Sequence, residues 1–222
     1  YIPSGSGNDL GRGLGISAKD PLEALQRILE AEQARYMDLG RVSWADDRGI
    51  RQSRLYAISA GIGFDALVCE LALHAKLKTF LNRIGLGKLV YLILTVKSMR
   101  ALQVQDAYIE FEGGESYELK DMVFAAAMNQ PYEGGGVPMA QNDDGLLSVI
   151  FVEDIPKKKM PRMLLRLLLK KHKKIQGLRL KDTKSVRIHS DTPLVVHSDG
   201  EFCGYRTDIR FEAEKGKLRI LC

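Results

Sequence analysis

The chain has few cysteines and no hydrophobic run long enough to cross a bilayer. Its three cysteines are odd in number and widely spaced, which predicts free thiols of a reducing compartment and excludes a disulfide framework or a zinc cluster. They are Cys69, Cys203 and Cys222. The longest apolar run, 89–96, lies between two lysines and is far shorter than the roughly 20 residues of a spanning helix. We therefore expect a cytoplasmic protein without a transmembrane segment.

Acidic residues are missing from one stretch, 157–174, although the chain as a whole has 28 of them. This stretch holds nine of the 33 basic residues, so the rest of the chain carries 24 basic residues and is weakly acidic. A local basic patch of this kind indicates either an anionic surface as partner or a solvated helix. The stretch also lacks aromatic residues, which argues against binding of nucleic acid.

The residues that are present predict a domain built mainly from short strands. With 222 residues and 45% apolar composition, the chain is long enough for one large domain with a real core. Residues 36–43 and 54–60 predict a hairpin that ends at Gly61-Ile62-Gly63. Later runs also have the pattern of strands. They are 104–112, 115–119, 122–128, 146–152, 178–180, 185–189, 194–197, 207–212 and 218–221. The expected fold class is α+β, mainly β: an antiparallel β-sandwich with helical insertions.

Helices are predicted at four places. Asp20-Pro21 combines an N-cap acid with proline at the first helical position and starts a helix that runs to about residue 34. Its apolar residues have helical spacing and predict a buried stripe. They are Leu22, Leu25, Ile28 and Leu29. The other helices are expected at 64–81, 86–102 and 157–174.

Four polar, glycine-rich segments are candidates for a functional site. They are Gly5-Ser6-Gly7-Asn8-Asp9, Gly61-Ile62-Gly63-Phe64-Asp65, the 134–146 segment and Ser198-Asp199-Gly200-Glu201-Phe202. Glycines allow backbone N–H groups to approach an anion closely, and the neighbouring acids can hold a metal or accept a proton. Taken one at a time, each segment also fits an ordinary turn or connector.

In this order the segments resemble the catalytic domain of the diacylglycerol kinase family, which includes bacterial lipid kinases and sphingosine kinases. The resemblance covers nearly the whole chain. The matching residues are Pro3 to Asp9, Asp20-Pro21, Asp38-Leu39-Gly40, Gly61 to Ala66, Gly134-Gly135-Gly136, Pro138, Ala140, Asp144 to Leu147 and Asp199-Gly200-Glu201.

The resemblance implies a lipid kinase, which moves the γ-phosphate of ATP to a lipid hydroxyl. Members of the family have an N-terminal α/β nucleotide-binding domain and a β-rich C-terminal domain, with the active site between them. Because the sequence contains no Gly-Gly-Asp-Gly-Thr phosphate loop, we assign residues 1–35 to a remnant of the first domain and 36–222 to the second. The missing nucleotide-binding domain is then an expected partner, and the chain alone is expected to be inactive.

The resemblance also implies roles for individual residues. Asp199 and Glu201 are the catalytic candidates, with the base and the residue that orients it left unassigned, and their spacing suggests that the two acids share one network. The cofactor-binding residues are Gly5, Ser6, Gly7, Asn8 and Asp9, with Asp9 expected in the same network. A structural Mg²⁺ is expected at Asp144 and the carbonyls of Gln141 and Leu146, with an Asp-Gly turn as the alternative. The implied cofactors are ATP and Mg²⁺, and the implied substrate is a lipid.

The basic stretch 157–174 would then meet an anionic membrane surface peripherally, as the headgroups of a lipid substrate require. Packing on the sandwich with solvated lysines is the alternative. A second function from a different class is a catalytically silent lipid- or membrane-binding module, and a third is an enzyme related to NAD kinase or phosphofructokinase. A homodimer is also left open by the sequence.

Overall fold

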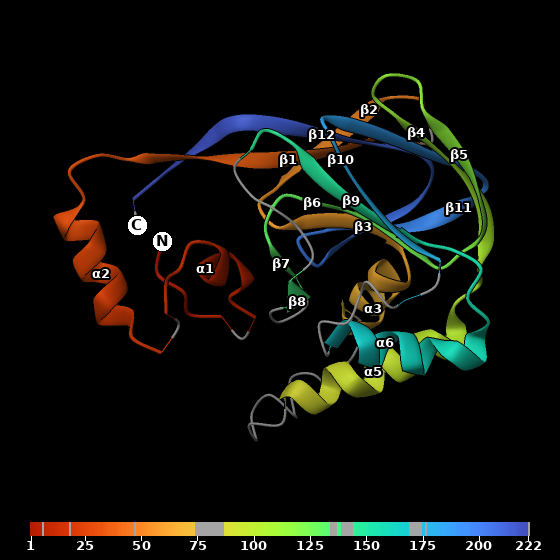
Figure 1. Ribbon diagram of the computed structural model, residues 1–222, viewed down its shortest axis with the longest axis horizontal. Helices are drawn as coiled ribbons and strands as arrows, with labels where there is room; N and C mark the ends of the chain where they lie inside the picture. The colour runs from red at the N-terminus through yellow and green to blue at the C-terminus, as the bar shows by residue number, and fades with distance from the viewer. Residues whose placement is uncertain are drawn as a thin grey trace.

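Antiparallel strands make up most of the molecule, and most of its helices lie on one side of them (Figure 1). The computed structural model describes residues 1–5, 7–17, 19–46, 48–73, 87–133, 137–138, 144–168, 175 and 177–221. Its helices are α1 (Asp9–Gly13), α2 (Pro21–Glu30), α3 (Phe64–Leu73), α5 (Gly87–Ala101), the short 3₁₀ turn η1 (Lys157–Lys159) and α6 (Met160–Leu168).

The strands confirm the predicted antiparallel, mainly β fold. They are β1 (Arg35–Ala45), β2 (Arg51–Tyr56), β3 (Ser59–Gly63), β4 (Gln105–Phe111), β5 (Ser116–Met122), β6 (Phe124–Met128), β7 (Tyr132–Glu133), β8 (Val137–Pro138), β9 (Leu147–Val152), β10 (Leu178–Thr183), β11 (Ser185–Ser198) and β12 (Glu201–Ile220). The strand order in the large sheet is β10-β9-β6-β3-β11-β12-β1-β2, and β4 with β5 joins it through β11.

Strand β11 connects the two halves of this curved sheet, one that continues from β3 to β6, β9 and β10 and one that contains β4 and β5. Its first part, Val186 to His189, pairs with β4, and its last part, Val196 to Ser198, pairs with β3. A break in its register against β12 between His189 and Leu194 separates the two parts. Such an irregularity bends a strand, so β11 can belong to both halves and close the sandwich around its core.

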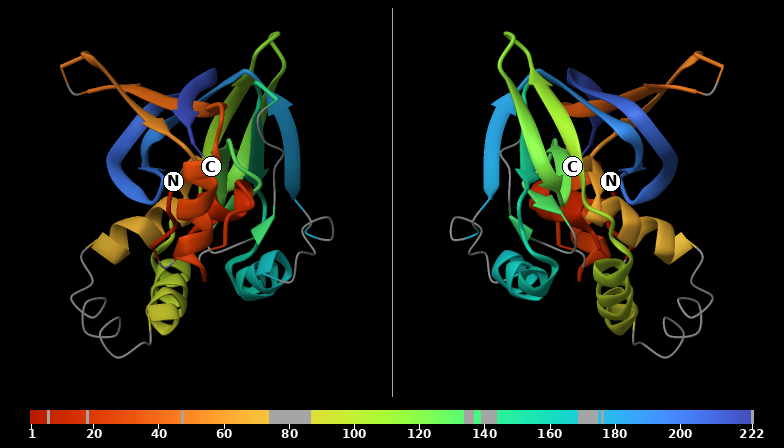
Figure 2. Two further views of the ribbon diagram at one scale, coloured as in Figure 1. Left: turned by 90° about the vertical axis from the view of Figure 1, so that its left-hand side faces the viewer. Right: turned by 90° about the vertical axis from the view of Figure 1, so that its right-hand side faces the viewer.

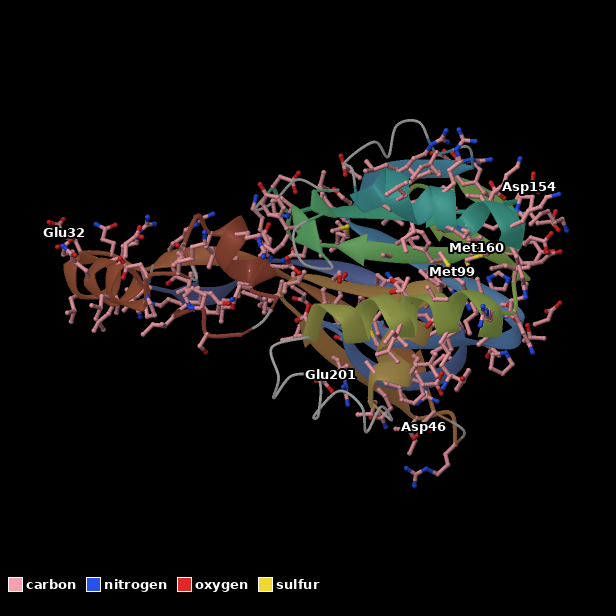
Figure 3. All side chains as sticks on the ribbon, turned by 90° about the horizontal axis from the view of Figure 1, so that it is seen from below. Glu32, Asp46, Met99, Asp154, Met160 and Glu201 are labelled. Carbon is pink, nitrogen blue, oxygen red and sulfur yellow. The ribbon has the colours of Figure 1, made fainter. Side chains whose placement is uncertain are left out.

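Strands β6 and β9 are buried on both faces, whereas β4 alternates between buried and exposed residues. One face of β6 and β9 meets the core between the two halves of the sheet, which includes Phe151 and Phe211. The other face is covered from below by α3, α5 and α6, and Figure 2 shows these helices beneath the strands. Figure 3 places Met99 of α5 and Met160 of α6 side by side in this second core.

The N-terminal segment forms a third, smaller core with the ends of β1 and β12. Leu14, Ile16 and Ala24 pack there against Met37 and Ile220. The predicted helix start is confirmed, because the Asp20 carboxylate accepts hydrogen bonds from the backbone N–H groups of Leu22 and Glu23, both at 3.1 Å. The helix ends earlier than expected, at Glu30.

The predicted burial of the leucine stripe on α2 is wrong. Leu22 is 75% exposed, Leu25 41% and Leu29 77%, and only Ala24 of this helix is buried. The reason is that α2 extends away from the sandwich, as Figure 3 shows at the end marked by Glu32. An amphipathic pattern predicts a helix with one apolar face but does not say which surface covers that face.

Two further predictions need correction. The strand expected at 54–60 is interrupted after Tyr56, and Gly61-Ile62-Gly63 forms the last part of β3, which pairs with β6 and β11. The runs expected as separate strands at 185–189 and 194–197 form the single strand β11, and those at 207–212 and 218–221 belong to β12. The pairing partners of each long strand change along its length, which short sequence windows cannot reveal. The helix expected at 64–81 is seen as far as Leu73, and the rest of it lies outside the described residues.

Candidate functional site

The Asp199-Gly200 pair forms the tight turn between β11 and β12. Both residues have positive φ angles, 47° and 83°, and Ser198 is paired with Glu201 across the turn. Two central residues in this region define the type I′ hairpin turn, for which Asp-Gly is a preferred sequence. The alternative interpretation of the motif as an ordinary hairpin turn is therefore correct for the backbone. Whether the motif also has a chemical role depends on its side chains.

The carboxylate of Asp199 holds the connection between β2 and β3. Its oxygens accept hydrogen bonds from the N–H groups of Ala57 at 2.7 Å, Ile58 at 2.8 Å and Ser59 at 3.1 Å. In return, the Asp199 N–H donates to the Ser59 carbonyl at 2.8 Å. A carboxylate that accepts three backbone N–H groups is fixed in place, so Asp199 joins the β11–β12 turn to this connection, here called the 57–59 loop.

Glu201 has different surroundings. Its side chain is exposed, and it lines a small hollow of about 130 Å³ whose other wall is the apolar surface of α3. The lining residues are Val68, Cys69, Ala72, Leu73, Gly200, Glu201 and Phe202. Figure 3 shows Glu201 beside α3 on the helix-bearing side of the molecule. No hydrogen bond among the described residues links the Glu201 and Asp199 carboxylates, so the shared network expected from their spacing is not found there.

A tyrosine on β12 fixes α3 against the strand that carries Glu201. The Tyr205 hydroxyl donates to the Glu70 carboxylate of α3 at 2.8 Å, and the ring packs edge to face on Phe202. Partial burial and the hydrogen bond to Glu70 raise the pKa of Tyr205 to about 12. The hydroxyl therefore stays protonated at neutral pH and keeps the wall of the hollow in place.

The N-terminal loop is closed by its own side chains. The Gly5 N–H donates to Asn8 Oδ1 at 2.9 Å, while Asn8 has a left-handed backbone, with φ of 55°, just before α1. Arg12 Nη1 donates to the Gly7 carbonyl and pairs with Asp9 Oδ1 at 2.6 Å. Asn8 thus shapes the loop, and Arg12, one partner of Asp9, lies in the same helix. Ser6 lies outside the described residues.

This loop and the β11–β12 turn lie at the same end of the sheet, joined by the 57–59 loop. The Ile58 carbonyl accepts hydrogen bonds from the N–H groups of Asn129 and Gln130, at the end of β6. Gln130 in turn packs against Gly13 of α1, so closely that a methyl group at Gly13 would overlap its side-chain oxygen. Three contacts thus link the candidate acid turn, through the 57–59 loop and Gln130, to the helix that carries Asp9.

The Asp144 loop is held by a buried acid on β1. Asp144 Oδ1 accepts a hydrogen bond from the Leu146 N–H at 2.9 Å, the contact of an ordinary Asx turn. The Asp38 carboxylate accepts from the N–H groups of Gly145 and Gly216, both at 2.7 Å, which joins the loop to β12. Gln141 lies outside the described residues, and no group of three metal-ligating side chains is found within the described part of the chain.

Sequence reasoning undervalued two residues that meet beside the turn. Asp65 was named only within a glycine-rich segment, and His197 was not among the candidate residues. In the structure His197 Nε2 lies 3.0 Å from Asp65 Oδ2, with the His197 side chain almost fully buried. A buried histidine needs polar partners. In the sequence, the position of His197 two residues before Asp199 was the available signal that it lies near the candidate site.

Two cysteines lie within the described part of the chain. Cys69 and Cys203 are free, and burial raises the pKa of the Cys203 thiol. None of the helices in the described part of the chain has the length and apolar character needed to span a bilayer.

Comparison with known proteins identifies the family of the chain. Residues 58–222 match the sequence model of the YegS C-terminal NAD kinase beta sandwich-like domain. YtlR of Bacillus subtilis, a protein named as a lipid kinase, is 27% identical over 99% of this chain and 71% of its own length. A diacylglycerol kinase of Mycobacterium tuberculosis is 26% identical over 90% of the chain and 62% of its own length.

The fold has the same relatives. The crystal structure of a diacylglycerol kinase from Bacillus anthracis matches 99% of this chain and 65% of its own chain, with a TM-score of 0.63 and 17% identity. The chain therefore spans about two thirds of the length of the proteins that it resembles. The family match covers most of the sequence, so this chain belongs to the family of the YegS-type C-terminal domain, within the diacylglycerol and lipid kinases.

Proposed function

We propose that this chain is the acceptor-binding part of an ATP-dependent lipid kinase, in which Glu201 accepts the proton of a lipid hydroxyl. One observation carries the proposal: the exposed carboxylate of Glu201 lines an apolar hollow, next to a turn that is fixed by three backbone hydrogen bonds to Asp199. An apolar wall suits the carbon chain next to the reacting hydroxyl, and a carboxylate within reach of that hydroxyl can act as its base.

In this mechanism the two acids have separate roles. Asp199 has its oxygens occupied by the 57–59 loop and holds the turn, whereas Glu201 is available to the substrate. As the hydroxyl oxygen attacks the γ-phosphate, its proton passes to a Glu201 oxygen, the bond from phosphorus to the bridging oxygen of ATP breaks, and ADP leaves. The apolar wall formed by α3 would hold the carbon chain of the lipid beside this carboxylate.

The described residues fit a nucleotide in part. The Gly5–Asp9 loop offers glycine backbone with the Arg12 guanidinium beside it, which is suitable chemistry for a phosphate. Mg²⁺ bound to the phosphates would supply charge neutralisation in the transition state. Asp144 is a candidate for a separate structural Mg²⁺, with its second carboxylate oxygen and the carbonyls of Gln141 and Leu146 as the proposed ligands.

The exposed leucines of α2 support a nucleotide-binding domain as the partner. Leu22, Leu25 and Leu29 lie on one face of the helix, and each exposes more than two fifths of its surface. Apolar stripes of this kind are usually covered in the assembled protein. We assign this face to contact with a nucleotide-binding domain. The relatives are longer than this chain, so their length allows for such a domain.

Peripheral binding to an anionic membrane is proposed for the basic face at η1 and α6. Lys157, Lys158, Lys159 and Arg162 are exposed, while Met160 and Met163 pack into the core under β6 and β9. The two methionines are therefore used for packing, and the lysines remain for a surface. Residues 169–174 of the basic stretch lie outside the described residues.

Vesicle binding tests the membrane contact. Replacing Lys157, Lys158 and Lys159 by glutamine should weaken binding to phosphatidylglycerol vesicles by roughly 100-fold, from about 1 kcal/mol for each lysine. The control replaces Lys19, Lys184 and Lys215, which removes the same charge elsewhere. If both triple variants bind alike, the basic face at η1 and α6 is not the contact.

A phosphorylation assay tests the proposed function. The chain is joined to the N-terminal region of a relative and given ATP, Mg²⁺ and either a lipid alcohol in micelles, glycerol or NAD. We expect phosphorylation of the lipid alone, and we expect Cys69→Trp, which fills the hollow, to raise KM for the lipid more than that for ATP. Phosphorylation of NAD would favour the NAD-kinase-like alternative, and vesicle binding without any transfer would favour the silent lipid-binding module.

A further inference from the structure

We propose that Asp65 and His197 are a positioning pair that sets the orientation of the Glu201 turn. The inference rests on the proposed function, since it concerns how the candidate base is held. Asp199 fixes the turn through its side chain on the side of the 57–59 loop. The contact that fixes the backbone of Gly200, next to Glu201, comes instead from His197.

The hydrogen bonds of His197 define its protonation. The Gly200 N–H donates to His197 Nδ1 at 3.3 Å, and because an amide N–H can only donate, Nδ1 must be the unprotonated nitrogen. In the neutral ring the proton is then on Nε2, which donates to Asp65 Oδ2 at 3.0 Å. The His197 side chain is 3% exposed, so water does not compete for either contact. Asp65 thus selects the tautomer that can accept from Gly200.

The glycine at position 61 makes room for this pair. A methyl group at Gly61 would overlap Asp65 Oδ2 and lie 2.9 Å from His197 Nε2, so any other residue would separate the two side chains. Gly61 has no positive φ angle that would explain a glycine there. The Gly61-Ile62-Gly63-Phe64-Asp65 segment is therefore shaped around the contact between Asp65 and His197, and this is a reason for its glycine that no turn provides.

The pair also connects the two walls of the hollow. Asp65 lies in the first turn of α3, where its other oxygen accepts a hydrogen bond from the Ala66 N–H at 2.8 Å. Further along the same helix are Val68 and Cys69, which line the hollow. A chain of contacts therefore runs from α3 through Asp65 and His197 to Gly200, in which Asp65 selects the tautomer of His197 and the contact from His197 to the Gly200 N–H holds the turn.

Two substitutions of His197 separate positioning from packing. Asparagine places an oxygen near the former Nδ1 and can still accept from Gly200, but it is too short to reach Asp65. Glutamine places its amide near the former Nε2 and can still donate to Asp65, but it offers nothing to Gly200. The proposal predicts that His197→Asn keeps kcat within about threefold of the parent. It predicts that His197→Gln loses about tenfold or more, because misplacement by about 1 Å can cost 10²-fold in rate.

A role in packing alone predicts the reverse order, since asparagine leaves the larger cavity at this buried position. The assay uses the chain joined to an N-terminal region, and urea unfolding of both variants accompanies it. An equal loss of kcat in both variants, or a larger loss in His197→Asn, overturns the proposal.

A second measurement on the 222-residue chain does not depend on catalysis. Long-range ¹H–¹⁵N NMR should find His197 protonated on Nε2 alone, and the Gly200 amide should exchange with solvent at least about tenfold faster in His197→Gln than in His197→Asn. A proton on Nδ1, or equal exchange in the two variants, overturns the positioning pair. If these results hold while the parent transfers no phosphate, then the proposed function fails and the pair remains as the support of the turn.

Discussion

Replacing Asp199 by asparagine separates its role from that of Glu201. The two oxygens of Asp199 accept three backbone hydrogen bonds, one from Ala57 through Oδ2 and two from Ile58 and Ser59 through Oδ1. Asparagine tolerates the left-handed backbone at this position, so the turn itself is not strained by the change. Its single oxygen can replace Oδ1, which leaves an NH₂ group facing the Ala57 N–H.

The magnitude follows from that lost contact. A hydrogen bond to a charged group contributes about 1.5–3 kcal/mol when sheltered from water. Asp199 is exposed, so we expect Asp199→Asn to lower the free energy of unfolding by about 1–2 kcal/mol. For a chain of this length the melting temperature should fall by roughly 2–8 °C. Glu201→Gln is the matched control: it removes the same charge two residues away and should leave stability within about 0.5 kcal/mol of the parent.

Urea unfolding followed by circular dichroism measures the difference. The midpoint should move for Asp199→Asn with an unchanged slope, because the native surface area stays the same. If both variants unfold at the same urea concentration, Asp199 does not support the 57–59 loop and the division of roles between the two acids is wrong.

Three other predictions concern contacts around the site. Gly40→Ala places a methyl group in a buried tyrosine ring and should lower the free energy of unfolding by at least about 2 kcal/mol in urea, whereas Gly7→Ala, which meets no close atom, should not. Absorbance titration should find the pKa of Tyr205 near 12 and nearer its usual 10 in Glu70→Gln. Because folding raises this pKa, the stability gained from the protonated hydroxyl is complete below pH 10 and is lost as the pH rises to 12, which alkaline unfolding should detect. Asp38→Ala removes the acceptor of two glycine amides and should speed hydrogen exchange of the Gly145 amide at least about tenfold.

Local signals in the sequence predicted local structure correctly. The N-cap at Asp20, the hairpin between β1 and β2 and the strands from β4 to β6 depend on neighbouring residues, and the sequence contains those neighbours. The Asp-Gly turn between β11 and β12 was likewise predictable as a turn. The chemistry of this turn was not, because the partners of Asp199 are about 140 residues away in the chain.

Contacts between distant segments account for the errors. Gly61 was interpreted as a strand breaker, yet it is a strand residue that must be small because Asp65 and His197 occupy the space beside it. The leucines of α2 were expected to be buried, yet they are exposed. An amphipathic pattern does not say which surface covers the apolar face of a helix. The separate environments of Asp199 and Glu201 depend on the 57–59 loop and α3, which neither motif mentions.

The most direct test of the central claim measures kcat for lipid phosphorylation by Glu201→Gln and Asp199→Asn, each joined to an N-terminal region. The account predicts that Glu201→Gln folds as stably as the parent and loses at least about 10²-fold in kcat, the contribution of a general base. It predicts that Asp199→Asn loses stability and a smaller share of kcat. Full activity of Glu201→Gln would contradict the assignment of the proton acceptor and with it the mechanism proposed for the hollow beside α3.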